Sequence, residues 1–265
     1  NMCPLLLERA INDSLKINKK PKAIILVHLY GMPAKINEIK EISKKYDIPL
    51  IEDAAEALGS NYDGIPLGTI GDFGVLSFNG NKIITTSGGG ALISSSLEHS
   101  KKAKFLSSQA KENTIHYQHK EIGYNYRISN VLAAIGLGQI EQIDKKIKIR
   151  RKNFSLYKKY LNNIEEISFL EEPLNFYSNR WITTILVSSQ NGFCKEKIIR
   201  NLRENKIESR PIWKPMHLQP LYKQYKFYNN NSSEKLFNLG LCLPSGTTLT
   251  EEQISKISQI IISSK

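Results

Sequence analysis

Apolar residues occur along the chain in two patterns that predict alternating strands and helices. The runs Lys22–Leu29 and Pro49–Glu52 are continuously apolar over most of their length, which is typical of strands buried on both faces. Between them, Lys35–Tyr46 has the spacing of an amphipathic helix. This order predicts a right-handed crossover and a parallel sheet, in which ligands bind at the carboxyl ends of the strands. Glu52, Asp53 and Glu56 lie at such an end, that of the second strand.

The same patterns predict two domains joined by a long helix. Residues 1–127 are expected to form a large domain, residues 128–162 a connecting helix capped by Ser129, and residues 163–265 a smaller α+β domain. Further elements are expected at 73–78 (strand), 91–94 (strand), 97–107 (helix), 182–187 (strand), 195–205 (helix) and 207–212 (extended), with a final helix opened by the capping-box pattern Thr250 to Gln253.

Composition narrows the class of protein. The 265 residues are 40% hydrophobic and include 16 glycines, which fits a folded globular chain and excludes a disordered one. No apolar run approaches the roughly 18 residues of a membrane-spanning helix. The net charge of +12 is spread over every segment, so a solvated surface is favoured over a nucleic-acid patch. The three cysteines, Cys3, Cys194 and Cys242, are far apart, which argues against disulfides and a zinc site and favours a reducing cytoplasm.

The strongest chemical signal is the segment Ser77-Phe78-Asn79-Gly80-Asn81-Lys82, which runs on to Gly90. A serine ends a strand, and a lysine follows in a polar loop, while Asp53 ends another strand. Pyridoxal phosphate needs such a set: a lysine for a Schiff base, a carboxylate at the ring nitrogen and a hydroxyl for the phosphate. Lys82, Asp53 and Ser77 are the candidates, and Lys82 would also move a proton as general acid and base. No metal ligand set is predicted.

Several motifs resemble the DegT/DnrJ/EryC1 family, and they occur in that family's order over nearly the whole chain. They are Val27–Gly31, Glu52–Ser60, Gly71–Gly74, Ser77–Gly90, Gly123–Arg127 and Arg210–Trp213. The resemblance implies a pyridoxal-phosphate-dependent transferase of fold type I, similar to aspartate aminotransferase, with a mainly parallel large-domain sheet and a small α+β domain. It also implies aminotransfer to a nucleotide sugar by a homodimer with shared active sites.

The resemblance carries roles to single residues. Lys82 matches the Schiff-base lysine, Asp53 the partner of the ring nitrogen and Ser77 the phosphate-binding serine. Glu56 lies where many relatives have Gln or His near the cofactor's phenolic oxygen, and Asn79 lies where many have His. The residues matched to the neighbouring subunit's phosphate region are Asn125 and Arg127, and those in the segment bordering the sugar-nucleotide pocket are Trp213, Lys214 and His217.

Several of these residues could instead have a purely structural role. Asp53 is also suited to capping a helix, and Ser77 to an ordinary strand end. Asn125 and Arg127 fit a turn with a salt bridge, and His28 fits a structural role at its strand end. Trp213 and His217 fit packed positions as well.

The chain departs from the family's pattern at its start. The family's phosphate loop, a stacking aromatic and the first strands of its seven-stranded sheet have no counterpart in this sequence, so we expect an N-terminally incomplete large domain. If the polypeptide begins here, weak cofactor binding or none is expected.

The expected reaction is transfer of an amino group from glutamate to C4 of a UDP-linked 4-keto-6-deoxy-N-acetylhexosamine. The sequences of Ser77–Thr86 and Gly240–Thr247 are most similar to those of the family's bacillosamine branch. Aminotransfer to another keto sugar nucleotide and a catalytically inactive paralogue stay open. The sugar 3-dehydrase branch has His at the lysine position, so Lys82 argues against it.

Overall fold

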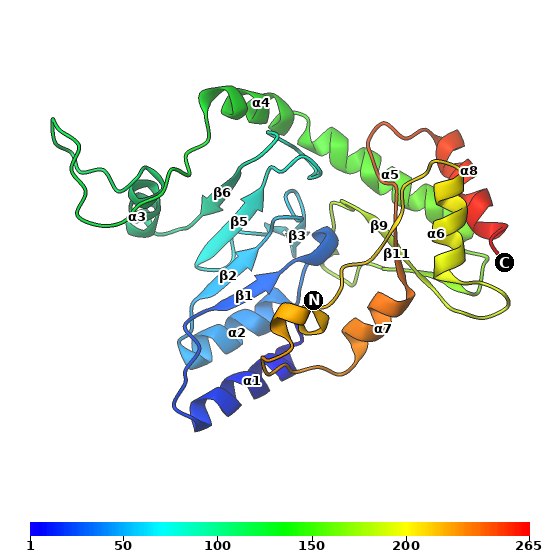
Figure 1. The fold of residues 1–265 in the computed structure, drawn as a ribbon, viewed down its shortest axis with the longest axis horizontal. Coiled ribbons are helices and arrows are strands. Elements are labelled where there is room, and N and C mark those ends of the chain that lie inside the picture. Colours follow the sequence, from blue (N-terminus) through cyan, green and yellow to red (C-terminus); the bar gives the residue numbers. More distant parts are fainter. The chain divides into compact units, whose positions relative to one another are not determined.

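The computed structural model describes residues 1–265, and the chain divides into two compact units (Figure 1). The first unit contains residues 1–4, 11–144 and 175–178, and the second contains residues 5–10, 145–174 and 179–265. The first unit therefore extends beyond the predicted large domain and includes the helix Asn130–Ile140.

The first unit is built on a four-stranded sheet with the order β1-β2-β5-β6. The strands β1 (Ile24–Val27), β2 (Leu50–Asp53) and β5 (Phe73–Ser77) are parallel, and β6 (Gly90–Ile93) runs antiparallel to β5. The helix α2 (Ile36–Tyr46) connects β1 to β2. The predicted strand–helix–strand crossover is confirmed, and it brings the ends of three parallel strands to one edge of the sheet.

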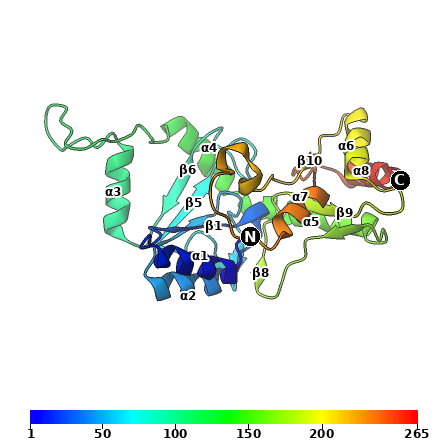
Figure 2. The same ribbon diagram turned by 60° about the horizontal axis from the view of Figure 1, so that its bottom comes forward.

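The helix α2 lies against one face of this sheet (Figures 1 and 2), and its sequence explains why. Ile36, Ile39 and Ile42 recur at helical spacing and are all buried. The helix ends at Asp47, whose φ of 49° is a left-handed conformation that closes the last turn. The α2 side of the sheet is therefore packed.

Shorter elements complete the first unit. Its helices include α3 (Leu97–Ser107) and α4 (Asn130–Ile140), with a 3-10 turn at Leu29–Gly31. The helix α1 (Pro4–Lys16) is divided, because residues 5–10 group with the second unit and residues 11–16 with the first. Ser129 accepts a hydrogen bond from the N–H of Leu132, so the predicted helix cap is confirmed. A small antiparallel sheet contains β3 (Asn61–Tyr62), β4 (Ile65–Pro66) and β8 (Phe176–Tyr177).

The helical segment expected at 128–162 consists of two helices. α4 ends at Ile140, and α5 (Ile143–Leu161) begins three residues later. At the junction the N–H of Gln142 bonds to the carbonyl of Gln139, one residue closer than in a regular α-helix. This tight turn needs neither proline nor glycine, so the sequence carries no obvious mark of it.

The second unit is an α+β structure around an antiparallel sheet with the order β10-β11-β9-β7. The strands are β7 (Ile167–Phe169), β9 (Thr183–Val187), β10 (Arg210–Pro211) and β11 (Gly240–Leu243). The helices are α5, α6 (Lys195–Glu204), α7 (Ser232–Leu239) and α8 (Glu251–Ile262), with 3-10 turns at Met216–Leu218 and Pro220–Tyr222. The capping box of Thr250 and Gln253 opens α8 as predicted.

One side of α5 holds the turn that follows β11. The Tyr157 hydroxyl donates to the carbonyl of Pro244 at 2.9 Å, and the Asn153 amide donates to that of Gly246 at 2.9 Å. The Arg150 guanidinium donates to the carbonyl of Ser245, and its burial lowers the pKa of this group to about 10. Burial likewise raises the pKa of Tyr157. These side chains lie at successive helical turns, so the helix fixes the turn along its length.

The two central strands of the first sheet leave no space for a side chain at Gly74. A Cβ atom there would lie 1.9 Å from the carbonyl oxygen of Gly68, which belongs to the loop that crosses this face. We therefore expect Gly74→Ala to lower the free energy of unfolding by about 3 kcal/mol, because backbone must move to accept the methyl group. Urea denaturation monitored by circular dichroism measures this loss.

Gly138→Ala is the matched control. No atom lies within 4 Å of the added Cβ, and the site is inside α4, where alanine is favoured over glycine by up to about 1 kcal/mol. Equal unfolding free energies for the two variants would contradict the close approach of Gly68 and Gly74.

Candidate active site

The two acidic residues at the end of β2 lie on opposite faces of the sheet. Asp53 pairs in register with Val27 of β1 and Val75 of β5. Val27 and Val75 are 38% and 37% exposed, so Asp53 belongs to the open face. Glu52, one residue earlier, is completely buried on the packed face, as alternation along a strand requires.

Glu52 is saturated with hydrogen bonds. One carboxylate oxygen accepts the N–H groups of Ile70 and Gly71 at 2.6 Å each. The other oxygen lies 2.8 Å from the N–H of Gly68 and 3.0 Å from Nε2 of His28. Burial alone would raise the pKa of Glu52, but these four hydrogen bonds outweigh it and lower the pKa. Glu52 is therefore a stable buried carboxylate.

The ring of His28 has a defined tautomer. Its Nδ1 accepts the N–H of Ala34 at 3.0 Å, so the proton is on Nε2 and is donated to Glu52. The backbone N–H of His28 donates to the carbonyl of Asp53 at 3.1 Å. The structural role expected for His28 at its strand end agrees with these contacts.

Asp53 has one free acceptor atom. Its Oδ1 accepts the N–H of Ala55 at 3.1 Å, while Oδ2 accepts no hydrogen bond. No helix begins at Asp53, so the alternative role as a helix cap does not apply. The open carboxylate oxygen is suited to a protonated ring nitrogen.

Lys82 and Glu56 meet beside this edge. Nζ of Lys82 lies 3.6 Å from Oε1 of Glu56, and the two side chains are only 13% and 12% exposed. The other oxygen of Glu56 accepts the backbone N–H of Tyr30 at 2.7 Å. Tyr30 has a φ of 58°, a left-handed conformation that is uncommon outside glycine and that turns its N–H toward Glu56. Sequence reasoning missed Tyr30, because nothing in its side-chain type signals this backbone role.

Ser77 and Asn79 form the start of the Lys82 loop. Ser77 is the last residue of β5, and its Oγ accepts the N–H of Asn79 at 3.4 Å. The serine hydroxyl keeps its proton free to donate. The carbonyl of Asn79 accepts the N–H of Lys82 at 3.0 Å, so this short turn ties the two residues together.

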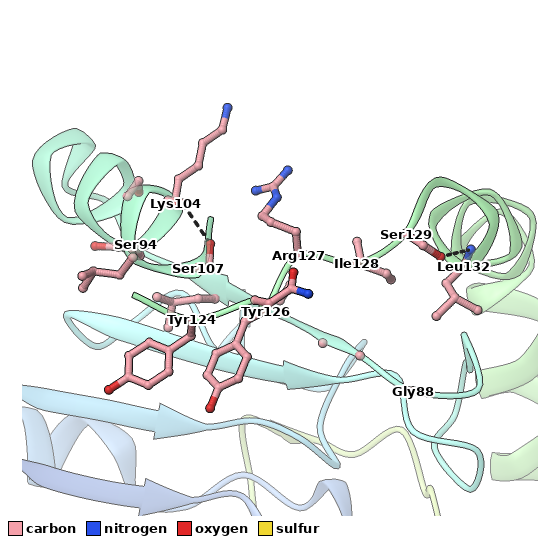
Figure 3. A pocket seen from close by; sticks show the side chains of 18 residues that line it. Gly88, Ser94, Lys104, Ser107, Tyr124, Tyr126, Arg127, Ile128, Ser129 and Leu132 are labelled. Carbon is pink, nitrogen blue, oxygen red and sulfur yellow. Dashed lines mark hydrogen bonds between the residues drawn. The ribbon is translucent and has the colours of Figure 1, made fainter. Parts of the chain in front are cut away.

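Asn125 and Arg127 line a separate hollow of about 920 Å³ (Figure 3). The other lining segments are Gly88–Leu92 and part of α3, which includes Lys104. Figure 3 shows the side chains of Lys104 and Arg127 extending in the same direction. Neither Asn125 nor Arg127 makes a side-chain hydrogen bond or ion pair, so the salt bridge considered for Arg127 is absent. Lys82 and Asp53 do not line this hollow.

The remaining candidates, Trp213, Lys214 and His217, belong to the second unit. Nε2 of His217 lies 2.9 Å from Oε1 of Glu234, and its ring stacks on Phe227 with centroids 4.5 Å apart. Trp213 is 38% exposed, so it is not a core residue, and Lys214 is exposed. His217 therefore fixes the segment 213–217, in which Trp213 and Lys214 stay accessible to solvent.

The family model and the most similar known proteins point to the same family. The model of the DegT/DnrJ/EryC1/StrS aminotransferase family matches residues 1–262. EpsN of Bacillus subtilis (strain 168), described as a pyridoxal phosphate-dependent aminotransferase, is 46% identical over 99% of this chain and 68% of its own length. The GDP-perosamine synthase of Escherichia coli O157:H7 is 37% identical over 93% of this chain and 66% of its own length. The chain thus spans about two thirds of the length of these relatives.

The name of a third relative refers to a UDP-linked sugar. The UDP-4-amino-4,6-dideoxy-N-acetyl-beta-L-altrosamine transaminase of Campylobacter jejuni (serotype O:23/36, strain 81-176) is 33% identical over 76% of this chain and 54% of its own length. The names of these relatives point to several sugar nucleotides and do not single out the bacillosamine branch.

Solved structures confirm the expected fold class. A DegT DnrJ EryC1 StrS aminotransferase from Brucella abortus superposes with a TM-score of 0.89 at 28% identity, covering 99% of this chain and 69% of that one. PseC of Helicobacter pylori gives a TM-score of 0.87 at 25% identity, and the match covers 97% of this chain and 70% of PseC. A sugar aminotransferase of Streptococcus pneumoniae in its PLP form gives 0.86 at 25% identity, covering 100% and 73%. None of the helices in the chain has the length and apolar character needed to cross a membrane.

The buried carboxylate predicts a pH-dependent stability difference. We expect Glu52→Gln to lower the free energy of unfolding at pH 7 by about 2–4 kcal/mol. The NH2 group of glutamine replaces one carboxylate oxygen and cannot accept the hydrogen bonds that this oxygen accepts. The pKa of Glu52 is lowered on folding from an ordinary value of 4.5, so its charge stabilises the fold above that pH. This contribution is lost as the pH falls through the lower, folded pKa.

Urea unfolding of both proteins over a series of pH values tests this expectation. The gap between wild type and Glu52→Gln should narrow below pH 4.5, whereas the exposed Glu41→Gln should differ little from wild type at any pH. A gap that widens on acidification would contradict the assignment of a charged Glu52.

Proposed function

Because the chain belongs to the DegT/DnrJ/EryC1/StrS aminotransferase family, we propose that it transfers an amino group from glutamate to C4 of a UDP-linked 4-keto-6-deoxy-N-acetylhexosamine. The enzyme class, an aminotransferase, and the cofactor, pyridoxal phosphate, follow from the family. The donor, the sugar and the position of the new amine are the parts that we propose, and the bacillosamine branch is our leading choice among the sugars.

The arrangement of Asp53, Ser77 and Lys82 is the observation that carries the proposal. All three lie at or just beyond the carboxyl ends of β2 and β5, where ligands bind in parallel sheets. The free Oδ2 of Asp53, the free hydroxyl proton of Ser77 and the amine of Lys82 match the ring nitrogen, phosphate and aldehyde of pyridoxal phosphate. The residues present therefore fit the cofactor.

Each side chain would have a defined task with the cofactor bound. Pyridoxal phosphate supplies an aldehyde that captures amines and a ring that accepts the electron pair released at the substrate carbon. Asp53 would accept the ring N–H and keep that nitrogen protonated, and Ser77 would donate to the phosphate. Lys82 would supply the amine that holds the cofactor and would then carry a proton to and from the substrate carbon.

We assign Glu56 to the phenolic side of the cofactor and Asn79 to the Lys82 loop. The N–H of Tyr30 orients Glu56, and the nearby ammonium of Lys82 offsets its charge. A carboxylate at this position would repel the anionic phenolic oxygen, and the ammonium of Lys82 would reduce that repulsion.

The sugar-nucleotide site is proposed to include Arg127, Trp213, Lys214 and His217. Arg127 has an unpaired guanidinium and Lys214 is exposed, so both are available to a diphosphate. Trp213 and the His217 segment offer accessible ring surface. The net charge of +12 is compatible with an anionic substrate.

We also propose a cytoplasmic homodimer with shared active sites. Asn125 and Arg127 line a hollow that Lys82 and Asp53 of the same chain do not line, which supports the idea that they serve the cofactor and substrate of a neighbouring subunit. The exposed apolar residues of this region are compatible with a partner: Ile115, Tyr117, Ile122, Val131, Ile135 and Leu137.

A second candidate is transfer to a GDP-linked keto sugar. The naming of a 37% identical relative as a GDP-perosamine synthase is the observation that favours it. It shares the cofactor and the roles of Asp53 and Lys82 with the first candidate, so only the substrate distinguishes the two.

Lys82 provides the first test. We expect Lys82→Ala to abolish turnover and the near-ultraviolet and visible absorbance of lysine-bound pyridoxal phosphate, because the variant lacks the amine proposed to hold the cofactor. Lys101→Ala, an exposed position on α3, is the matched control and should keep both. Retained turnover in Lys82→Ala would refute the assignment.

The substrate is tested by a panel of keto sugars. Purified protein loaded with pyridoxal phosphate is incubated with glutamate and either UDP-linked or GDP-linked 4-keto-6-deoxy sugars, and 2-oxoglutarate and the amino sugar are measured by mass spectrometry. We expect the UDP-linked N-acetylated substrate to give a kcat/KM at least about tenfold higher than the GDP-linked sugar. The reverse preference would favour the second candidate.

A further inference from the structure

A buried, hydrogen-bonded pair of a carboxylate and a neutral histidine lies next to the candidate cofactor-binding residue Asp53, in β2 and at the end of β1. Glu52 and His28 are both completely buried and are joined by a 3.0 Å hydrogen bond. Neither faces the open side of the sheet, so neither is available to a ligand. Their position next to Asp53 needs another explanation.

Both residues are linked to Asp53 through the backbone. Glu52 precedes Asp53 in β2, and the N–H of His28 donates to the carbonyl of Asp53. On the other side, the N–H of Ala54 donates to the carbonyl of Val75. The backbone around Asp53 is therefore hydrogen-bonded to both neighbouring strands. The side-chain hydrogen bond between Glu52 and His28 fixes the position of His28, whose N–H makes one of these backbone bonds.

The same pair anchors the loop that crosses the packed face. Glu52 collects three N–H groups from residues 68–71, and His28 collects the N–H of Ala34. These contacts join the strand that carries Asp53 to the loop at residues 68–71 and to the segment after β1. The pair thus acts on the position of its neighbour.

We propose that Glu52 and His28 are positioning residues that hold Asp53 in place as the acceptor for the cofactor's ring nitrogen. The inference rests on the proposed function, because it assigns Asp53 to pyridoxal phosphate. It adds two buried residues to the site, although neither touches the cofactor.

Variants of His28 separate its two hydrogen bonds. An asparagine oxygen replaces Nδ1, so His28→Asn keeps the acceptor for Ala34 and loses the donor to Glu52. A glutamine amide replaces Nε2, so His28→Gln keeps the donor and loses the acceptor. The proposal therefore predicts unequal effects from two substitutions at one buried position.

The experiment is a titration of the full chain with pyridoxal 5'-phosphate, followed by absorbance. We expect Glu52→Gln and His28→Asn to raise the Kd by about tenfold or more and to alter the bound cofactor's spectrum, as loss of a hydrogen bond to a charged group implies. His28→Gln should stay within about threefold of wild type. Equal Kd values and spectra for wild type, Glu52→Gln and His28→Asn would overturn the proposal.

A double-mutant cycle shows whether the effect passes through Asp53. If Glu52 acts by positioning Asp53, then Glu52→Gln should change the Kd of an Asp53→Asn protein far less than that of wild type. The same fold-change in both backgrounds would mean a general structural role and would overturn the proposal. If Glu52→Gln does not fold, the same cycle with His28→Asn decides.

Ser43→Ala is the control for a buried hydrogen bond remote from the cofactor. It removes the 2.7 Å bond from Ser43 to the carbonyl of Ile48 in the same unit. We expect it to lower thermal stability without changing the Kd or the spectrum; a tenfold change in Kd here would count against a specific role for the pair. If wild type itself binds no pyridoxal phosphate, the proposed function fails, and the positioning role with it.

Discussion

The alternation of side chains along β2 is the constraint on which the candidate site depends. Two consecutive acids end this strand, and the pleat directs Glu52 into the packed face and Asp53 onto the open face. Because Glu52 is saturated by four donors, it is a structural anion. Asp53 keeps one oxygen free and is the acid that remains for chemistry. A shift of one residue in the register would exchange these roles.

The rest of the first unit supports this division. The loop at residues 68–71 supplies donors to Glu52, and it fits there only because Gly74 presents no side chain. At the same edge, the left-handed backbone of Tyr30 directs its N–H to Glu56, which lies beside Lys82. Packing on one face and chemistry on the other are thus parts of one arrangement, in which backbone groups orient the ionisable side chains.

Much of the first unit, and the strand ends that carry the candidate residues, could be predicted from the sequence. The apolar runs located β1, β2 and β5, and strand-end positions identified Asp53, Ser77 and Lys82 as candidates. The burial of Glu52 could not be predicted, because its donors come from a loop that approaches only in the folded chain. The break between α4 and α5 depends on one hydrogen bond at Gln142, and the orientation of Glu56 depends on a backbone angle at Tyr30. Such local choices leave little trace in residue type.

The central claim is that one lysine at the carboxyl edge of the parallel sheet holds pyridoxal phosphate. The direct measurement is borohydride reduction of the protein mixed with pyridoxal phosphate, followed by proteolysis and mass spectrometry. With 29 lysines in the chain, many amines compete for the aldehyde at high concentration. At one equivalent of cofactor, we expect the reduced adduct on Lys82. An adduct spread over surface lysines, with no enrichment at Lys82, would contradict it.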